Sequence, residues 1–446
     1  MGYTGNSLKA LGGALVLATM LSGCSGLSDL NPFGSDDEYL EGDRKPLYET
    51  QAGQSAAVGA TAHIGAASGG SSWPQPAGNI SNDPGNIAVN VNGNLAWAKN
   101  IGAVRGGGLL SLGSTPPRNA ARPVSDGSRV FVYKQDGDLV VLNTSGKQLY
   151  SRSLRPEEES AVAIGGGVAL SGGKTFVATA YRQVFALDSA GKPLWTYDLE
   201  VGVRGAPTAA AGLVIVVTQE NEVIALNQND GSKAWSFAGI SETAGLLATA
   251  SPAVKGNSVV VPFSSGEVMA LNVKNGEPKW IDALARSFRT RALSGLTDVA
   301  ASPVIDGDRV YTTSLSGRTI ASRLANGERI WEADIGSTHT PVVSGGTVFM
   351  IGLDDNLHAL DSKTGAPIWT AQLPDLSKKK ENWAGPILAN GKLIVVSNEG
   401  GFAQVDARSG SVLAQKRIKE DVFVTPIVAG GRMIVLTGNG SVAAFN

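Results

Sequence analysis

The chain has 446 residues, of which 42% are hydrophobic and 17% charged, with a formal net charge of −2. A balance this close to neutral provides no basic surface for nucleic acid, so we expect no nucleic-acid partner. The single cysteine, Cys24, and three separated histidines form no set of zinc ligands, so we expect no metal site.

Residues 1–23 have the pattern of a lipoprotein signal peptide. The apolar stretch from Ala10 to Leu21 is too short to cross a bilayer as a permanent helix. It leads into Leu-Ser-Gly-Cys24, which resembles the bacterial lipobox, where the cysteine becomes the lipidated first residue. Cys24 is therefore the predicted lipidation site, and several acyl chains such as palmitate would anchor the chain stably. Because Ser25 follows instead of an aspartate, we expect attachment to the outer membrane, facing the periplasm.

Residues 24–90 are expected to form a flexible tether between the lipid and a folded domain. The segment is poor in large apolar residues and rich in glycine, alanine, serine, asparagine and proline, as linkers are. Its acidic residues lack the spacing of a calcium-binding loop, so we interpret them as solvated linker charge.

One phrase, Gly-x-x-x-Trp, recurs beyond residue 91, shortly after apolar runs that end in Asp or Asn. Six copies end in Trp97, Trp195, Trp235, Trp280, Trp331 and Trp369, and two degenerate copies end in Tyr150 and Ala414. The spacing of about 40–50 residues is typical of repeat arrays and propellers. Short apolar and β-branched runs between Gly, Asp, Asn and Ser predict strands, and no window supports a helix. Each repeat therefore predicts a four-stranded antiparallel sheet.

Eight such repeats predict an all-β fold, an eight-bladed β-propeller over residues 91–446, because stacked blades bury faces that one sheet cannot bury alone. We expect each tryptophan to pack against a neighbouring blade, with its N–H bonded at a sheet edge. The glycine before each turn supplies a positive φ. The ring is predicted to close by pairing the first strand, about Asn94–Ile101, with the strands between Thr425 and Asn446.

The search for catalytic chemistry gives no convincing candidate. His339 lies just before a proline at the start of a strand, and His358 fills a strand position held elsewhere by Ile224 or Met269. A lone histidine without partners is a weak catalytic candidate. No Gly-x-Ser-x-Gly elbow lies between a strand and a helix. We therefore expect no catalytic residue and no cofactor, and interpret the chain as not an enzyme.

The string Ala-Leu-Asp/Asn followed by Gly-x-x-x-Trp resembles the PQQ-type β-propeller repeat. One branch of that family, the quinoprotein dehydrogenases, binds calcium and pyrroloquinoline quinone and commonly carries a vicinal disulfide, which a chain with one cysteine cannot make. The BamB branch is similar along the whole mature length, through the lipobox, the tether and the eight blades. This resemblance implies a non-enzymatic scaffold subunit of the β-barrel assembly (Bam) complex that assists insertion of outer-membrane proteins.

The resemblance also implies partner-binding residues. Val201-Gly202-Val203-Arg204-Gly205 resembles the BamB loop that docks on the periplasmic POTRA domains of BamA, which makes Val201, Val203 and Arg204 candidates. An exposed arginine between aliphatic residues is also typical of an interface hot spot. A second family loop with two acidic positions matches at Asp298, whereas its other position is Ala300. Other Bam subunits and unfolded outer-membrane proteins are further implied partners.

Two alternatives stay open on the sequence. The chain could be a quinone-dependent dehydrogenase relative, which would take up the cofactor with calcium and reduce a dye. It could also be a cell-envelope propeller that binds polysaccharide or another ligand.

Overall fold

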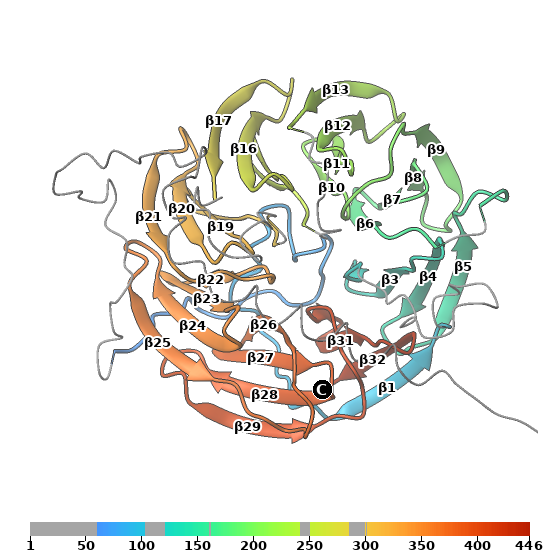
Figure 1. Cartoon of the computed structure of the whole chain (residues 1–446). Helices are drawn as coiled ribbons and strands as arrows, with labels where there is room; N and C mark the ends of the chain where they lie inside the picture. Colours follow the sequence, from blue (N-terminus) through green and yellow to red (C-terminus); the bar gives the residue numbers. More distant parts are fainter. Residues whose placement is uncertain (1–59, 103–120, 160–161, 241–249, 285–298, 300) are drawn as a thin grey trace, which may run out of the picture. The chain divides into compact units, whose positions relative to one another are not determined.

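The computed structural model describes residues 60–102, 121–159, 162–240, 250–284, 299 and 301–446. Over these residues the chain is all β. Thirty-two strands form eight four-stranded antiparallel sheets arranged in a ring, which confirms the predicted eight-bladed β-propeller (Figure 1). Within this described part of the chain, no helix is long and apolar enough to cross a membrane. Cys24, Asp298 and Ala300 lie outside the described residues.

In seven sheets the four strands follow one another in chain order from the inside of the ring to its rim. The first four of these sheets are β2 (Val124–Ser125), β3 (Arg129–Tyr133), β4 (Asp138–Asn143) and β5 (Gln148–Ser153); β6 (Gly166–Ser171), β7 (Lys174–Thr179), β8 (Gln183–Leu187) and β9 (Pro193–Asp198); β10 (Thr208–Ala210), β11 (Leu213–Val217), β12 (Glu222–Asn227) and β13 (Lys233–Ala238); and β14 (Ala253–Lys255), β15 (Ser258–Pro262), β16 (Glu267–Asn272) and β17 (Pro278–Ala283). The next three are β18 (Val304–Asp306), β19 (Arg309–Thr313), β20 (Thr319–Arg323) and β21 (Arg329–Ala333); β22 (Val342–Ser344), β23 (Thr347–Ile351), β24 (Asn356–Asp361) and β25 (Pro367–Gln372); and β26 (Trp383–Ala389), β27 (Lys392–Ser397), β28 (Gly401–Asp406) and β29 (Val412–Arg417).

The eighth sheet closes the ring with strands from both ends of the propeller. It consists of β30 (Ile427–Ala429), β31 (Arg432–Leu436) and β32 (Ser441–Phe445), with β1 (Leu95–Asn100) as its outer strand. β1 runs antiparallel to β32, with Ala98 opposite Ala443 and Lys99 opposite Val442. The predicted pairing of the first strand with the last ones is therefore confirmed.

The hydrophobic core lies between neighbouring sheets. Phe176 and Val184 of the sheet β6–β9 pack in one cluster with Val214 and Ile224 of the sheet β10–β13. Similar clusters join the other neighbouring sheets. Because the hydrophobic effect favours burying both faces of each sheet, the ring is held by its interfaces.

The tryptophan and glycine of the repeated phrase act across these interfaces. The indole of Trp195 on β9 donates to the carbonyl of Gln228 at 3.2 Å in the turn of the next sheet. Gly231 of that turn lies against the same ring, and a Cβ added there would be 2.7 Å from it. The other five indoles make the same bond at 2.8–3.3 Å, namely Trp97, Trp235, Trp280, Trp331 and Trp369. Each glycine therefore serves the tryptophan of the preceding blade.

This contact predicts a large effect of one added methyl group. Gly231→Ala is expected to lower the free energy of unfolding by about 3 kcal/mol, because the residue has a φ of 75° and no room for a Cβ. Gly212→Ala is the matched control, since Gly212 has a φ of 79° but no atom within 4 Å of the added Cβ. Urea unfolding followed by fluorescence should show a loss of about 1 kcal/mol for the control. Equal losses would show that the indole contact contributes nothing.

Residues 60–92, which we call the axial strap, cross the middle of the ring (blue trace in Figure 1). The strap hydrogen bonds to the inner strand of seven sheets and, through Ser71, to Gly430 directly after β30. The seven bonds join Trp73 to Ser125, Pro74 to Leu170, Gln75 to Ala209, Ile80 to Val254, Ser81 to Ile305, Gly65 to Ser344 and Ile87 to Leu388. The expected tether over residues 24–90 is therefore wrong for residues 60–90, and residues 24–59 lie outside the described part.

Two buried amide side chains fix the strap to the sheets. Gln75 donates to the carbonyls of Leu170 and Ala209 at 3.0 and 3.3 Å. Asn82, which is 1% exposed, donates to the carbonyls of Ser251, Pro252 and Pro303 at 3.1, 3.4 and 3.0 Å. Buried polar groups require such partners, so these bonds hold the strap in one position relative to several blades.

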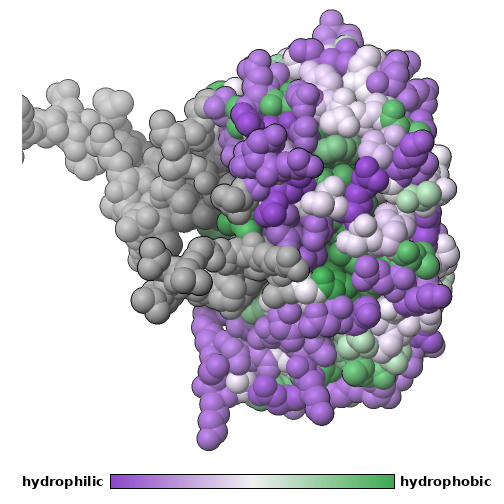
Figure 2. All heavy atoms as spheres, turned by 90° about the vertical axis from the view of Figure 1, so that its right-hand side faces the viewer, coloured by the Kyte–Doolittle hydropathy of each residue, from purple (hydrophilic) through white to green (hydrophobic). Residues whose placement is uncertain are grey.

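The outer rim of the ring is mostly polar. Figure 2 shows a side of the molecule on which hydrophilic residues cover most of the surface and hydrophobic residues form separate patches. The outer strands carry isolated exposed aliphatic residues, such as Leu149 on β5 and Leu194 on β9, at 47% and 49% exposure. Single exposed residues of this kind are ordinary on a protein surface.

Candidate functional site

The segment containing Val201, Val203 and Arg204 connects β9 to β10. Val203 forms an isolated antiparallel bridge with Thr218, and the amide of Arg204 donates to the carbonyl of Val217 at 2.9 Å. The Val203 side chain is fully buried in the core between two sheets, whereas Val201 is half-buried. The segment therefore lengthens the sheet β10–β13 beyond β10, and only part of it can meet a partner.

Arg204 is buried, and the expectation of an exposed arginine is wrong. Its side chain is only 4% exposed, and its Nη1 donates to Oδ1 of Asn221 at 3.3 Å. A guanidinium group can be buried at acceptable cost only when acceptors surround it. Asn221 supplies one, because this residue sits in the turn between β11 and β12 with a φ of 63° and is itself fully buried.

Asn221 links three neighbouring parts of the fold. Besides accepting from Arg204, its Nδ2 donates to the carbonyl of Ile240 at 2.6 Å and to Oγ of Ser264 at 2.8 Å. Ile240 follows β13, and Ser264 lies in the turn between β15 and β16. The Arg204–Asn221 pair thus joins this end of the sheet β10–β13 to the turn of the next sheet.

The second predicted segment approaches the same turn. Asp298 itself lies outside the described residues, but its neighbour Val299 is fully buried and donates from its amide to the carbonyl of Phe263 at 3.5 Å. Phe263 directly precedes Ser264. The described ends of the two candidate segments are therefore connected through Asn221, Ser264 and Phe263.

Two exposed aliphatic residues near this network were not singled out from the sequence. Ile240 is 56% exposed and its carbonyl is held by Asn221, while Ile164 is 39% exposed and its carbonyl accepts from Gln219 at 3.4 Å. We call these two residues, together with half-buried Val201 of the candidate segment, the apolar rim. An asparagine inside a charged turn, Glu-Asn-Glu, was the one sequence signal for the buried centre of this site.

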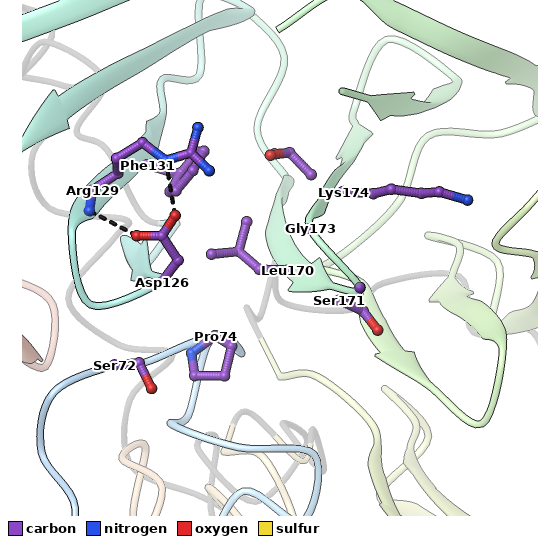
Figure 3. Close-up of a pocket in the computed structure, with 11 residues that line it drawn as sticks. Ser72, Pro74, Asp126, Arg129, Phe131, Leu170, Ser171, Gly173 and Lys174 are labelled. Carbon is purple, nitrogen blue, oxygen red and sulfur yellow. Dashed lines mark hydrogen bonds and ion pairs between the residues drawn. The ribbon is translucent and has the colours of Figure 1, made fainter. Parts of the chain in front are cut away.

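A separate cavity of about 250 Å³ lies between the strap and the sheets β2–β5 and β6–β9 (Figure 3). It is at the ends of the strands that lie away from the Arg204–Asn221 pair, beside the turns β2–β3 and β6–β7. Pro74, Phe131 and Leu170 form its apolar wall. Asp126 pairs with Arg129 at 2.8 Å and also accepts from Ser128. Burial alone would raise the pKa of Asp126, but these hydrogen bonds lower it below its usual value. The carboxylate of Asp126 therefore stays ionised, and its oxygens are already hydrogen-bonded to Arg129 and Ser128.

The histidines have structural surroundings. His358 on β24 is 5% exposed, and its ring nitrogens lie 2.9 Å from Asp354 Oδ1 and 3.1 Å from Thr370 Oγ1, which agrees with a packed strand position. Burial and the nearby Arg122 lower the pKa of His339 to about 4, so its imidazole is neutral at neutral pH. Among the described residues, no group of three or more His, Cys, Asp and Glu side chains could hold a metal.

Comparison with known proteins assigns the family. Residues 157–371 and 354–446 match the sequence model described as outer membrane protein assembly factor BamB. The chain belongs to the BamB family. A BamB from Moranella endobia is 25% identical over 356 residues, which is 78% of this chain and 89% of that protein.

Structural comparison agrees with the BamB fold. The structure of BamB from Moraxella catarrhalis matches with a TM-score of 0.65 at 16% identity, over 79% of this chain and 99% of that one. A europium-containing methanol dehydrogenase matches almost as well, with a TM-score of 0.63 at 14% identity, over 82% of this chain and 89% of that one. At such low identity both likenesses show the fold alone, so the sequence match to BamB decides the family.

Proposed function

We propose that this BamB-family chain is a non-enzymatic scaffold subunit of the outer-membrane β-barrel assembly complex that binds the periplasmic POTRA domains of BamA. The observation that carries the proposal is the family match over residues 157–446, which contains both candidate segments. The relatives are named as outer membrane protein assembly factors. Contacts with other Bam subunits, and with unfolded outer-membrane proteins, belong to the same proposal.

The geometry changes which residues should make the contact. Val203 and Arg204 are buried, so they position the surface, while the apolar rim of Ile164, Val201 and Ile240 is available to touch BamA. Aliphatic residues around a rigid centre fit the usual anatomy of a binding hot spot, in which few well-supported side chains carry most of the affinity. If Asp298 also takes part, its neighbour Val299 ties it to the same network.

The fold likeness to a methanol dehydrogenase favours the alternative that this chain is an enzyme, whereas the axial strap argues against that alternative. Small-molecule sites are concave and formed where several elements meet, and the centre of a propeller is such a place. In this chain the strap fills one end of that centre with its own buried amides. Uptake of pyrroloquinoline quinone with calcium and reduction of a dye would overturn the scaffold proposal.

Binding of the soluble chain, from Ser25 onward, to the BamA periplasmic domains tests the proposal. Ile240→Asp is expected to weaken binding at least tenfold, which is about 1.4 kcal/mol, and to leave the Tm unchanged because the side chain is exposed. Arg204→Ala should lower both binding and Tm. Leu194→Asp, at a similarly exposed site on β9, is the control and should bind normally. No binding by the wild type would contradict the proposal, whereas normal binding by Ile240→Asp would move the contact elsewhere.

The anchor is part of the same proposal. We propose that Cys24 carries the acyl chains and that the protein faces the periplasm from the outer membrane. The strap is compatible with this arrangement, since the amide of Ala62 donates to the carbonyl of Arg408 and residues 25–61 separate Ala62 from Cys24 in the sequence. Mass spectrometry of the protein from outer-membrane fractions should find the acyl mass on an N-terminal Cys24, and an unmodified cysteine there would contradict it.

A further inference from the structure

Seven of the eight interfaces between sheets contain the same packing contact between an aromatic ring and a glycine. In each, an aromatic ring from an outer strand lies on the glycine of the next sheet's turn, so closely that a Cβ on that glycine would be 2.5–2.9 Å from the aromatic residue. The pairs are Trp97 with Gly146, Tyr150 with Gly191, Trp195 with Gly231, Trp235 with Gly276, Trp280 with Gly327, Trp331 with Gly365 and Trp369 with Gly410. Six of these rings are indoles bonded to a backbone carbonyl.

The eighth interface, between the sheets β26–β29 and β30–β32 with β1, has no aromatic residue at this position of its outer strand, and the ring over its glycine, Gly93, comes from Phe402 on β28. The position of the tryptophan is Ala414, which is exposed, whereas the tryptophans of β9, β13, β17, β21 and β25 are buried. Opposite Ala414 stands Gln404, where Ala359 stands opposite Trp369 in the preceding sheet. Gln404 donates through Nε2 to the carbonyl of Val91, so an amide replaces the indole N–H at this interface.

A cavity of about 340 Å³ opens at this interface. Its apolar wall includes Leu95, Ile418 and Phe445, and Gly93 forms one side. The methylene stem of Lys416 and the ring of Phe402 cover Gly93 where the indole would lie, at 2.7 and 2.9 Å from an added Cβ. Lys416 also donates to Oδ1 of Asn94 at 2.7 Å, so the free space lies beside these two side chains. A cavity of about 150 Å³ is large enough for a benzene ring, so this one has room for an aromatic side chain.

Among the described residues, no strand pairs with the outer edge of β29, the strand beside the cavity. β29 is the outer strand of its sheet, and its first four residues are exposed, with Val412 and Leu413 at 41% and 50%. In Figure 1 it lies on the rim, next to β1. An outer strand presents unpaired backbone groups to which an extended peptide can add. The charged residues that line the cavity are Lys416, Arg417, Lys419 and Glu420, an excess of positive charge.

We propose that this closing interface is a docking site for an extended peptide that pairs with the edge of β29 and inserts one aromatic side chain, flanked by acidic residues, into the cavity beside Gly93. The chain itself shows seven times that an aromatic ring fits between an outer strand and such a glycine. Because the lining carries an excess of positive charge, it favours a peptide with acidic residues on either side of the aromatic one. The site lies apart from the Arg204–Asn221 network, so it does not depend on binding to BamA.

The experiment measures binding of labelled pentapeptides to the soluble chain by fluorescence polarisation. The probes have valine beside a central residue and glutamate at both ends, with tryptophan or alanine in the centre. The tryptophan peptide should bind at least tenfold more tightly than the alanine peptide. Ala414→Trp, which fills the cavity with the chain's own indole, should weaken tryptophan-peptide binding at least tenfold. Gln415→Trp, on the opposite face of the same strand, is the matched control and should bind as the wild type does.

A second variant keeps the proposal testable if Ala414→Trp does not fold. Lys419→Glu, at an exposed position, should weaken the glutamate-flanked peptide at least fivefold and strengthen a lysine-flanked one. Equal binding of the tryptophan and alanine peptides, or full binding by Ala414→Trp, would overturn the proposal. BamA binding by Ala414→Trp should stay normal, so failure of the peptide site and failure of the scaffold proposal give different results.

Discussion

Replacing Asn82 by alanine is expected to lower the free energy of unfolding by about 3 kcal/mol. The Asn82 side chain is 1% exposed, and its amide donates to the carbonyls of Ser251, Pro252 and Pro303, which directly precede the inner strands β14 and β18 of two neighbouring sheets. Removing the amide leaves buried acceptors without a donor, at a cost of about 1–3 kcal/mol. Alanine also tolerates the φ of 58° at this position less well than asparagine does. Urea unfolding followed by tryptophan fluorescence measures the loss.

Asn390→Ala is the matched control for this change. Asn390 also has a positive φ, of 45°, and its amide makes one hydrogen bond, to Asn90 at 2.8 Å, but the residue is exposed. Water replaces that bond when the side chain is removed, so we expect a loss of about 1 kcal/mol or less. A strap that merely crossed the ring without stabilising it would make Asn82→Ala as mild as the control, and that result would contradict a stabilising role for the strap.

The propeller could be predicted from the sequence because its repeated phrase reports packing directly. Each tryptophan must lie in the same phase, since each indole meets the glycine of the following turn, and the period then gives the number of sheets. Closure also followed from the sequence, because the strands at the two ends of the array complement each other. The Gly-x-x-x-Trp period and the incomplete repeats at the two ends can be recognised in the sequence because each depends on short local patterns that recur.

The axial strap could not be predicted in this way, because it binds through backbone groups and isolated amides. Its glycine, serine and proline content is that of a linker, and Gln75 and Asn82 reveal nothing until their acceptors are placed. One signal was present: Ile87, Val89 and Val91 are buried and alternate with the exposed residues Ala88 and Asn90. That period of two is the pattern of a half-buried extended segment.

The burial of Arg204 was likewise decided by a residue outside its own motif. The sequence around it, with aliphatic neighbours and glycine, suits an exposed loop. The side chain is buried because Asn221, on a different hairpin, offers an acceptor at 3.3 Å. The neighbouring exposed residue Ile240 could not be ranked as a contact from sequence, since nothing local distinguishes it from the exposed aliphatic residues of the outer strands.

A second large effect is expected at Asp83 in the strap, and it depends on pH. Burial, and then repulsion from Asp306, raise the pKa of Asp83 to about 7, against opposing hydrogen bonds from the amides of Gly85 and Val343 and the charge of Lys255. One carboxylate oxygen, Oδ1, is buried and has no hydrogen-bond partner among the residues that the structure describes. The folded protein therefore holds this carboxyl group as the neutral acid up to nearly neutral pH.

The sign of the effect follows from linkage. In the unfolded chain Asp83 has its ordinary pKa of 3.8, so between about pH 4 and 7 the folded state binds a proton that the unfolded state has lost. The contribution of Asp83 to stability is therefore fully present below pH 4 and is lost as the pH rises to 7. Asp83→Asn is neutral at every pH, so it should be more stable than the wild type by roughly 2–4 kcal/mol at pH 8 and nearly equal to it at pH 4.

Urea unfolding of both proteins at pH 4, 6 and 8 tests this, with Asp126→Asn as a control of opposite sign. The pKa of Asp126 is lowered by its bonds to Ser128 and Arg129 although burial opposes this, so removing its charge should destabilise the protein at pH 8 and matter less at low pH. If Asp83→Asn and the wild type lose stability in parallel from pH 4 to 8, Asp83 is ionised in the folded protein. The strap would then hold a solvated carboxylate, and its fit against the sheets β18–β21 and β22–β25 would be looser than the contacts of Ser81 and Val343 indicate.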